Sequence, residues 1–303
     1  MHTRIRLVLL SGMLLASLAG AHHESSPAHP RAVTLTHVHG LAYSADGKQL
    51  MVPSHHGLAV YRDGKWSMAS GPQHDYMGFA AARIRLYSSG HPAPGSKLIN
   101  PLGLIRSGDG GKTWEKLSLE GESDFHLLAA GWNTNAVYVW NAEKNSRMPL
   151  PGLHFTLNEG FMWKRAAAKG LTGKPRALTV HPGDTKTVAV GTSSGVYVSK
   201  NSGDSFEPLT RGAEGLAVFF DLNGTDLWHS TYDGNPRLVR VDLKGGAAAA
   251  VALPPLRDDA VAYIAQNAAN PKEYAIATFE RSVYISKDAG KTWKQIADRG
   301  SGK

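Results

Sequence analysis

The chain of 303 residues contains no cysteine, carries a formal net charge of +8 and is 42% hydrophobic and 19% charged. The absence of cysteine excludes disulfides, thiolate zinc sites and cysteine nucleophiles, and the apolar content excludes a largely disordered chain. The positive charge is not gathered into a basic block with interleaved aromatic residues, so we expect no nucleic-acid binding.

Residues 1–21 have the pattern of a secretory signal peptide. Two arginines precede the apolar run LVLLSGMLLASLAG, and residues 19–21 have the A-x-A form of a cleavage site. The apolar run is too short for a comfortable membrane span. We therefore expect export to the periplasm or secretion after cleavage near Ala21, and no membrane span.

Residues 22–33 are expected to form a flexible N-terminal segment. It contains the string HHESSPAHP, and histidine-rich tracts commonly bind metals weakly. Cleavage after Ala21 makes His22 the new N-terminus, where its amine and imidazole could chelate copper with help from His23. We favour a solvated leader and keep the tail site as the alternative.

Residues 34–298 indicate a single domain of short β-strands. The 33 glycines and 16 prolines of the chain suit a turn-rich β protein. Apolar runs that begin six successive units start near residues 37, 74, 124, 174, 214 and 258. This spacing is typical of β-propeller blades made of four short strands. We predict an all-β, six-bladed β-propeller without helices, closed by an N-terminal strand that pairs with the last blade, and keep seven blades as the alternative.

One sequence motif occurs three times. The segments SGDGGKTWEKL, SKNSGDSFEPL and SKDAGKTWKQI share the pattern S-x-[DN]-x-G-x-[ST]-[WF]. In such a turn the Asp or Asn accepts backbone N–H bonds, the Gly allows a positive φ and the aromatic residue packs between neighbouring sheets. The motif predicts structural turns at Asp109, Gly111 and Trp114, at Asn201, Gly203 and Phe206, and at Asp288, Gly290 and Trp293.

The repeated motif resembles the Asp-box, or BNR, repeat of sialidases, sortilin-type receptors and the photosystem II assembly factor family. This resemblance implies a β-propeller and, in the Asp-box enzymes, an active site on the face away from the repeated turns. Similar exported bacterial sequences are often labelled glycosyl hydrolases. A sialidase would also have a Phe/Tyr-Arg-Ile-Pro sequence, whereas the nearest string here is ARIRLYSSGHP. We therefore do not expect sialidase activity.

Seven histidines fall near strand ends in the first three predicted blades. The link into an inner strand and the loop between the second and third strands open on the same face of a propeller, so these side chains are expected to meet there. An H-x-H pair on a strand sends both imidazoles to one side, and imidazole is the commonest protein ligand for metals. The candidate ligands are His37, His39, His55, His56, His74, His91, His126 and Met77, whose thioether favours copper.

Four further residues are compared with this cluster. We expect His181 in a turn on the opposite face and His154 packed within a strand. His229 is expected to end a second strand, from which it could reach the histidine-bearing face in blade five. Met148 is a weaker candidate ligand in the corresponding loop of blade three.

The cluster predicts a monomeric, metal-binding propeller that sequesters, buffers or passes on copper, with zinc as the alternative metal and another periplasmic protein as a further partner. In this interpretation Asp75 and Asp124 orient imidazoles. A metal-free polar pocket remains the alternative reading of the cluster.

Two other functions stay open, although we do not favour an enzyme. A glycoside hydrolase would use two carboxylates across a cleft, here Asp75 and Asp124, with further candidates in Glu214, Asp258 and Asp259. A protein-interaction scaffold is the third reading, in which the seven tryptophans and ten tyrosines supply anchors.

Overall fold

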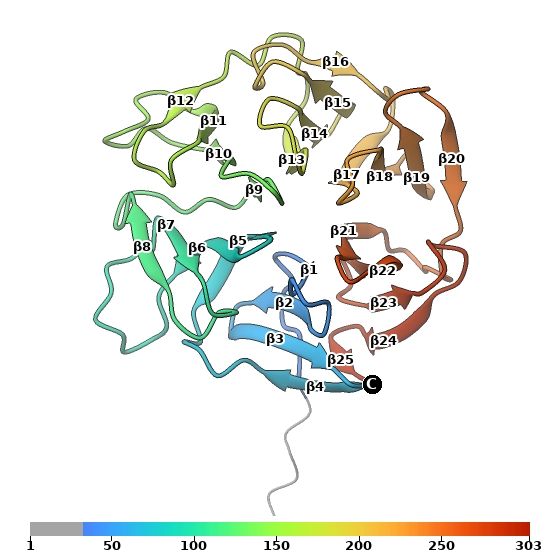
Figure 1. The fold of residues 1–303 in the computed structure, drawn as a ribbon, viewed down its shortest axis with the longest axis horizontal. Helices are drawn as coiled ribbons and strands as arrows, with labels where there is room; N and C mark the ends of the chain where they lie inside the picture. The colour runs from blue at the N-terminus through green and yellow to red at the C-terminus, as the bar shows by residue number, and fades with distance from the viewer. Residues whose placement is uncertain (1–32) are drawn as a thin grey trace, which may run out of the picture. The chain divides into compact units, whose positions relative to one another are not determined.

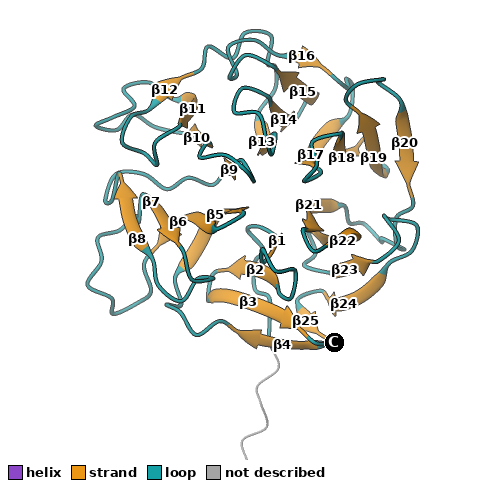
Figure 2. Cartoon of the chain, in the orientation of Figure 1, coloured by secondary structure: helices purple, strands orange, loops and turns teal. Residues whose placement is uncertain are grey.

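The computed structural model describes residues 33–303, and in this range the chain forms β-strands and no helix (Figures 1 and 2). The strands make six small antiparallel sheets arranged as a ring, so the predicted six-bladed β-propeller is confirmed. The expected signal peptide and the histidines of the N-terminal segment lie outside the described residues. Within those residues, no helix is long and apolar enough to cross a membrane.

The first three blades occupy the N-terminal half of the ring. Blade 1 contains β1 (Ala42–Tyr43), β2 (Leu50–Ser54), β3 (Gly57–Arg62) and β4 (Lys65–Met68). Blade 2 contains β5 (Asp75–Ala82), β6 (Arg85–His91), β7 (Leu104–Ser107) and β8 (Glu115–Ser118). Blade 3 contains β9 (Leu128–Ala130), β10 (Val137–Asn141), β11 (Gly152–Thr156) and β12 (Lys164–Arg165).

The last three blades complete the ring. Blade 4 contains β13 (Pro175–Val180), β14 (Val188–Thr192), β15 (Gly195–Ser199) and β16 (Glu207–Pro208). Blade 5 contains β17 (Glu214–Phe220), β18 (Asp226–Tyr232), β19 (Pro236–Asp242) and β20 (Ala248–Val251). Blade 6 contains β21 (Val261–Asn267), β22 (Asn270–Thr278), β23 (Val283–Ser286), β24 (Lys294–Asp298) and β25 (Ser301–Gly302).

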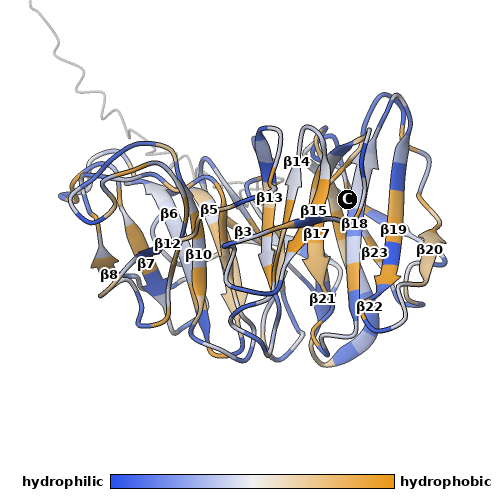
Figure 3. Ribbon diagram, turned by 90° about the horizontal axis from the view of Figure 1, so that it is seen from above, coloured by the Kyte–Doolittle hydropathy of each residue, from blue (hydrophilic) through white to orange (hydrophobic). Residues whose placement is uncertain are grey.

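Each blade starts at the axis and ends at the rim of the ring (Figure 1). Because its strands pair antiparallel in chain order, the start of the inner strand and the loop between the second and third strands lie at the same end of the blade. The strands therefore run between two faces made of loops, as the side view shows (Figure 3). This arrangement is what allows residues far apart in the sequence to meet on one face.

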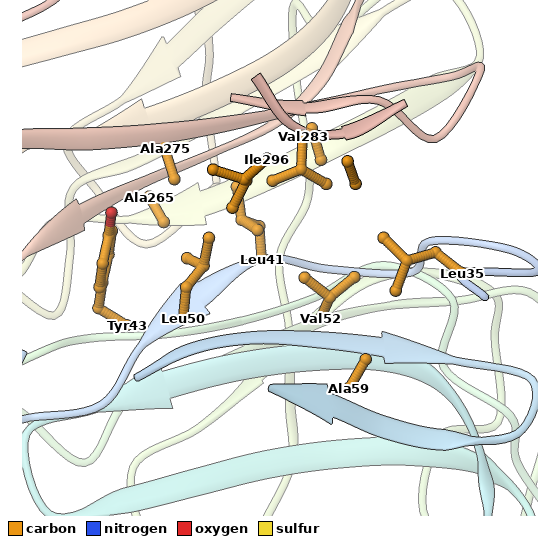
Figure 4. Close-up of a cluster of buried hydrophobic side chains, with 12 residues drawn as sticks. Leu35, Leu41, Tyr43, Leu50, Val52, Ala59, Ala265, Ala275, Val283 and Ile296 are labelled. Carbon is orange, nitrogen blue, oxygen red and sulfur yellow. The ribbon is translucent and has the colours of Figure 1, made fainter. Parts of the chain in front are cut away.

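The core is divided into six apolar clusters, one at each junction between adjacent blades. The junction of blades 1 and 6 brings Leu50 and Val52 against Val283 and Ile296 (Figure 4). Burying each such side chain contributes about 1.5–3 kcal/mol. A single blade cannot bury both of its faces, so the fold requires the complete ring.

The ring closes through the N-terminal segment, as predicted. Thr34 forms an antiparallel bridge with Ser301, and the Leu35 N–H donates to the Gly300 carbonyl at 2.7 Å. The indole N–H of Trp66 in blade 1 donates to the Ile296 carbonyl of blade 6 at 2.8 Å. The strand that takes part in this closure, β25, follows residue 298, where we expected the domain to end.

The three repeated motifs form the same hydrogen-bonded turn. In blade 2 the Ser107 hydroxyl accepts from the Gly111 N–H at 2.8 Å, and the Asp109 carboxylate accepts from the Thr113 N–H at 2.9 Å. The same bonds recur in the turns of blades 4 and 6. Each motif aromatic packs on the preceding blade; Trp114, for example, contacts the cluster shared with blade 1.

A fourth turn of this kind, in blade 3, was missed at the sequence level. The Thr156 hydroxyl accepts from the Gly160 N–H at 3.0 Å, and the Asn158 side-chain oxygen accepts from the Met162 N–H at 2.9 Å. Between them, the Glu159 carboxylate pairs with arginines of blade 2 and accepts from the Tyr87 hydroxyl at 3.0 Å. The turn therefore also ties blade 3 to blade 2.

The inner strands of four blades contain a β-bulge near their first residues. The register with the second strand shifts in β5, β13, β17 and β21. In β13, Pro175 pairs with Thr192 and Ala177 with Gly191, which leaves Arg176 as the extra residue. A bulge redirects side chains, so side chains do not alternate regularly between the two faces of the sheet at these positions.

The fourth turn gives a stability prediction. Asn158→Ala removes the acceptor for the Met162 N–H and the Thr156 hydroxyl, so the free energy of unfolding should fall by about 1–2 kcal/mol. Asn158→Asp keeps the acceptor and should restore most of the loss in urea unfolding. The control is Asn133→Ala, an exposed residue without a side-chain hydrogen bond in residues 33–303. An equal loss in both alanine variants would contradict the assigned role.

Candidate metal-binding site

One loop face of the propeller carries most of the predicted ligands. We call it the histidine face; it is formed by the segments that precede the inner strands and by the loops between the second and third strands. The pair of His37 and His39 precedes β1, and His55 and His56 are the two central residues of the turn between β2 and β3. The repeated turns, which connect the third and fourth strands, lie at the opposite end of their blades.

Three imidazoles of blade 1 come together on this face. Each of His37, His39 and His55 offers a ring nitrogen that lies within 4.8 Å of the other two. The ring centroids of His37 and His55 are 4.3 Å apart, and those of His39 and His55 are 4.9 Å apart with the planes stacked at 13°. We call this group the histidine triad.

The H-x-H pair meets His55 for a reason other than the one we predicted. His37 and His39 lie in the irregular segment before β1 and not in the strand itself, with ring centroids 5.9 Å apart. The His39 N–H donates to the Pro53 carbonyl at 3.1 Å, which fixes this segment beside the end of β2. The turn position of His55 then places its ring next to both.

His39 is the most constrained member of the triad. Its Nε2 is buried and has no hydrogen-bond partner among residues 33–303. Burial, together with the neighbouring imidazoles of His55 and His37, lowers the pKa of His39 to about 4. The ring is therefore neutral at pH 7, which is the protonation state that binds metals.

Two carboxylates lie beside the triad and face imidazoles. Asp124 Oδ2 is 2.7 Å from His126 Nε2 and 3.3 Å from His91 Nε2, and the hydrogen bond to Asp124 raises the pKa of His126. Asp75 Oδ1 lies 3.9 Å from His55 Nε2. Asp75 Oδ1 and Asp124 Oδ1 are buried without a hydrogen-bond partner in the described part of the chain.

The remaining predicted ligands stand apart from the triad. His74 is buried, its Nδ1 accepts from the Ala93 N–H at 2.9 Å, and burial lowers its pKa. His56 is exposed, and Met77 lies half-buried in the bulge of β5. Among the described residues, the group whose ligand nitrogens converge contains neither His56 nor His74.

The comparison residues give two corrections. Met148 is fully buried in the apolar cluster between blades 2 and 3, so its loop folds inward and the sulfur does not face the histidine face. His229 lies in the middle of β18, paired with Val218, and does not reach that face. His154 is buried within β11 as predicted, and His181 holds a turn by accepting from the Asp184 N–H at 3.0 Å.

The other candidate carboxylates have structural partners or project away. Glu214 forms an ion pair with Arg176 at 3.0 Å, and Asp259 Oδ1 accepts from the Ala260 N–H at 2.8 Å. Asp258 is exposed in a turn with a φ of 49°. Asp75 and Asp124 are therefore the carboxylates of the predicted set that remain for chemistry on this face.

The histidine face also holds residues that the sequence did not single out. An axial channel with a volume of about 350 Å³ opens beside the triad, and His39 and His126 are among its lining residues. Lys174, Arg176 and the exposed ring of Phe279 lie at the same end of it. Arg176 owes its position to the bulge in β13, which a simple strand pattern does not reveal.

Comparison with known proteins identifies the fold but no family. No protein-family model and no curated protein matches the chain. Among solved structures, a GH74 enzyme from Niastella koreensis matches with a TM-score of 0.61 at 15% identity, covering 88% of this chain and 46% of that one. A GH74 xyloglucanase from Xanthomonas campestris matches with a TM-score of 0.58 at 16% identity and the same coverage.

The chain thus spans less than half the length of these two enzymes. A third similar structure, YCF48 bound to a D1 peptide, has a TM-score of 0.48 at 20% identity, with 89% of this chain and 86% of that chain covered. At the identities of the two GH74 matches, the likeness establishes the propeller fold and leaves the activity open.

The buried His229 gives a prediction about stability and pH. Burial lowers the pKa of this imidazole to about 4, below the ordinary value of 6.5. Between these values the unfolded state binds the additional proton, so the free energy of unfolding should fall by about 3 kcal/mol as the pH drops from 6.5 to 4. His229→Gln should remove this part of the pH dependence in urea unfolding. His181→Gln is the control, and an unchanged slope in the His229 variant would refute the prediction.

Proposed function

We propose that the propeller binds a transition metal ion through the histidine triad, with copper preferred over zinc. The observation that carries the proposal is His39: its buried Nε2 has no hydrogen-bond partner in residues 33–303. One ring nitrogen of the same imidazole lies within 4.8 Å of ring nitrogens of His37 and His55. A buried polar atom left unpaired costs about 1–3 kcal/mol. A bound metal ion would remove this penalty.

The residues of the triad fit such an ion. Metal–nitrogen bonds of about 2.0–2.1 Å place the ligands of one ion about 3.4 Å apart, so the observed spread, within 4.8 Å, requires modest rotation of the rings. His55 in a two-residue turn and the exposed His37 have the freedom to rotate. Imidazole sites bind divalent copper more tightly than zinc, which is the reason for preferring copper.

The neighbouring carboxylates support this role. An imidazole that binds a metal through one nitrogen commonly donates its other ring N–H to a carboxylate. This bond fixes the orientation of the ring and raises its basicity. Asp75 lies near His55, and Asp124 holds His126 and His91. His91 and His126 are the candidates for a further ligand, because three or four nitrogens complete the coordination of one ion.

We further propose that the chain handles copper outside the cytoplasm, by sequestering it, buffering it or passing it to a periplasmic partner. The signal-like residues 1–21 and the absence of cysteine support this location. A histidine site suits an oxidising compartment, where a thiolate site would be lost to oxidation.

The metal proposal predicts a defined loss of binding. Protein without a purification tag should bind copper at near-equal stoichiometry in a competition titration against a chelator. His39→Ala should lower the copper affinity at least about 100-fold, because it removes one of the three proposed ligands. His181→Ala, on the opposite face, should leave the affinity unchanged. A variant with His22, His23 and His29 replaced by alanine separates a tail site from the triad.

Two results would overturn the metal proposal. One is protein that takes up neither copper nor zinc near neutral pH. The other is copper binding that survives His39→Ala but is lost with the three tail histidines, since that places the ion in the N-terminal segment.

A glycoside hydrolase is the second candidate. It is favoured by the two carboxylates of the histidine face, Asp75 and Asp124, each with a buried oxygen that lacks a hydrogen-bond partner in the described chain, and by the GH74 fold neighbours. Both carboxylates face imidazoles, which is why the metal proposal comes first.

The hydrolase candidate is tested with xyloglucan and related β-glucans. If it holds, chelator-treated protein should release reducing sugar, and Asp75→Asn or Asp124→Asn should abolish turnover while thermal unfolding remains unchanged. Absence of turnover in the unsubstituted protein would remove this candidate.

A further inference from the structure

The axial channel is a second feature of the histidine face, and His39 is the member of the triad that lines it. Its volume of about 350 Å³ lies within the range of about 300–1,000 Å³ that small-molecule sites occupy. The lining comes mostly from the inner strands of the six blades and contains many small residues. The lining alanines are Ala42, Ala80, Ala81, Ala129, Ala130, Ala177, Ala217, Ala262 and Ala265.

The charges of the channel are unbalanced. Its lining contains two cationic side chains, Lys174 and Arg176, and no carboxylate. Lys174 directly precedes β13 and Arg176 is its second residue, so both cations lie at the histidine face. The other end is lined by uncharged residues such as Trp132 and Gln266, which follow or end their inner strands.

The two cations differ in how they are held. Arg176 is the extra residue of the β13 bulge, and its guanidinium is fixed by an ion pair with Glu214 at 3.0 Å, a residue outside the lining. Lys174 is exposed and forms no ion pair within residues 33–303. Lys174 is thus the cation available to an anionic ligand, and Arg176 supplies a preoriented second donor.

The walls next to these cations are apolar. Leu127 and Leu216 line the channel without joining any of the six core clusters, so their side chains serve the channel surface. At the entrance, Phe279 is 56% exposed, although an aromatic ring of this size is usually buried. Exposed aromatic surface beside an apolar cavity is typical of a ligand entrance.

We propose that the axial channel binds a small organic monocarboxylate with an apolar body. The carboxylate lies against Lys174 and Arg176 at the histidine face, and the apolar body extends along the alanine and leucine walls toward the uncharged end. Because Arg176 is already paired with Glu214, the charge of Lys174 is what favours an anion over a neutral or cationic molecule of the same shape. This site needs no metal and stands independently of the copper proposal.

The test uses three probes that share one body: 4-phenylbutanoate, 4-phenylbutan-1-ol and 4-phenylbutylamine. Binding to the chelator-treated, full-length protein is measured by calorimetry and by ligand-observed NMR. The carboxylate should bind at least tenfold more tightly than the alcohol, and the amine more weakly than either. Equal affinities for the carboxylate and the alcohol, or no binding of the carboxylate up to millimolar concentration, would overturn the proposal.

Variants then locate the bound probe. Lys174→Ala should weaken the carboxylate about tenfold and leave the alcohol unchanged, while Lys174→Arg should retain binding. The matched control is Lys200→Ala, an exposed lysine at the repeated turn of blade 4 and outside the channel. Leu127→Trp should block all probes, with circular dichroism as the check on folding. An equal effect of the two alanine variants would contradict a site in the channel.

Discussion

The apolar contacts between neighbouring blades are the interaction on which the whole molecule depends. Every core cluster is shared by two blades, so no blade completes its own core. At the junction of blades 1 and 6, Leu35, Leu50, Val283 and Ile296 are almost fully buried. Their burial contributes several kcal/mol in total, whereas each backbone bond across this junction contributes about 1 kcal/mol. Burial therefore holds the ring closed, and the hydrogen bonds set its register.

The stability of the ring also explains how the histidine face can contain buried polar atoms that lack hydrogen-bond partners. Buried oxygens of Asp75 and Asp124 and the Nε2 of His39 lack hydrogen-bond partners within residues 33–303. Each would be destabilising in isolation, and the surrounding blades provide the compensating free energy. The carboxylates lie close to imidazoles, with Asp124 Oδ2 2.7 Å from His126 Nε2 and Asp75 Oδ1 3.9 Å from His55 Nε2. The histidine face is therefore an electrostatically strained surface on a strongly stabilised scaffold.

Much of the architecture could be predicted from the sequence because it follows from repetition. The spacing of apolar runs indicates six blades, and the shared pattern at Asp109, Asn201 and Asp288 indicates the turns. The fourth turn was missed because Thr156 and Met162 depart from the pattern, although the hydrogen bond at Met162 uses only its backbone N–H. A hydrogen bond to a backbone N–H forms whatever the side chain at that position is. A search for a fixed residue pattern misses such a turn when the side chain changes.

The details of the candidate site were harder to predict. Antiparallel pairing places His37, His39 and His55 on one face, and this much follows from strand order. The inward path of Met148 depends on how a long loop packs, and the position of Arg176 depends on a single extra residue in β13. Neither the path of this loop nor the extra residue can be read from the spacing of hydrophobic residues in the sequence. The sequence therefore indicated the face and all three histidines of the triad, but not the cationic channel.

The closure of the ring has a consequence for the order of events during biosynthesis. His37 follows directly on a segment that is held by the far end of the chain: the Leu35 N–H donates to the Gly300 carbonyl, and Arg281 donates to the Thr36 carbonyl at 3.2 Å. The segment that leads into His37 is therefore held in place only after the last blade has docked, whereas His39 and His55 are positioned within blade 1. A chain that lacks the last blade therefore presents His37 on a segment that is not yet held in place.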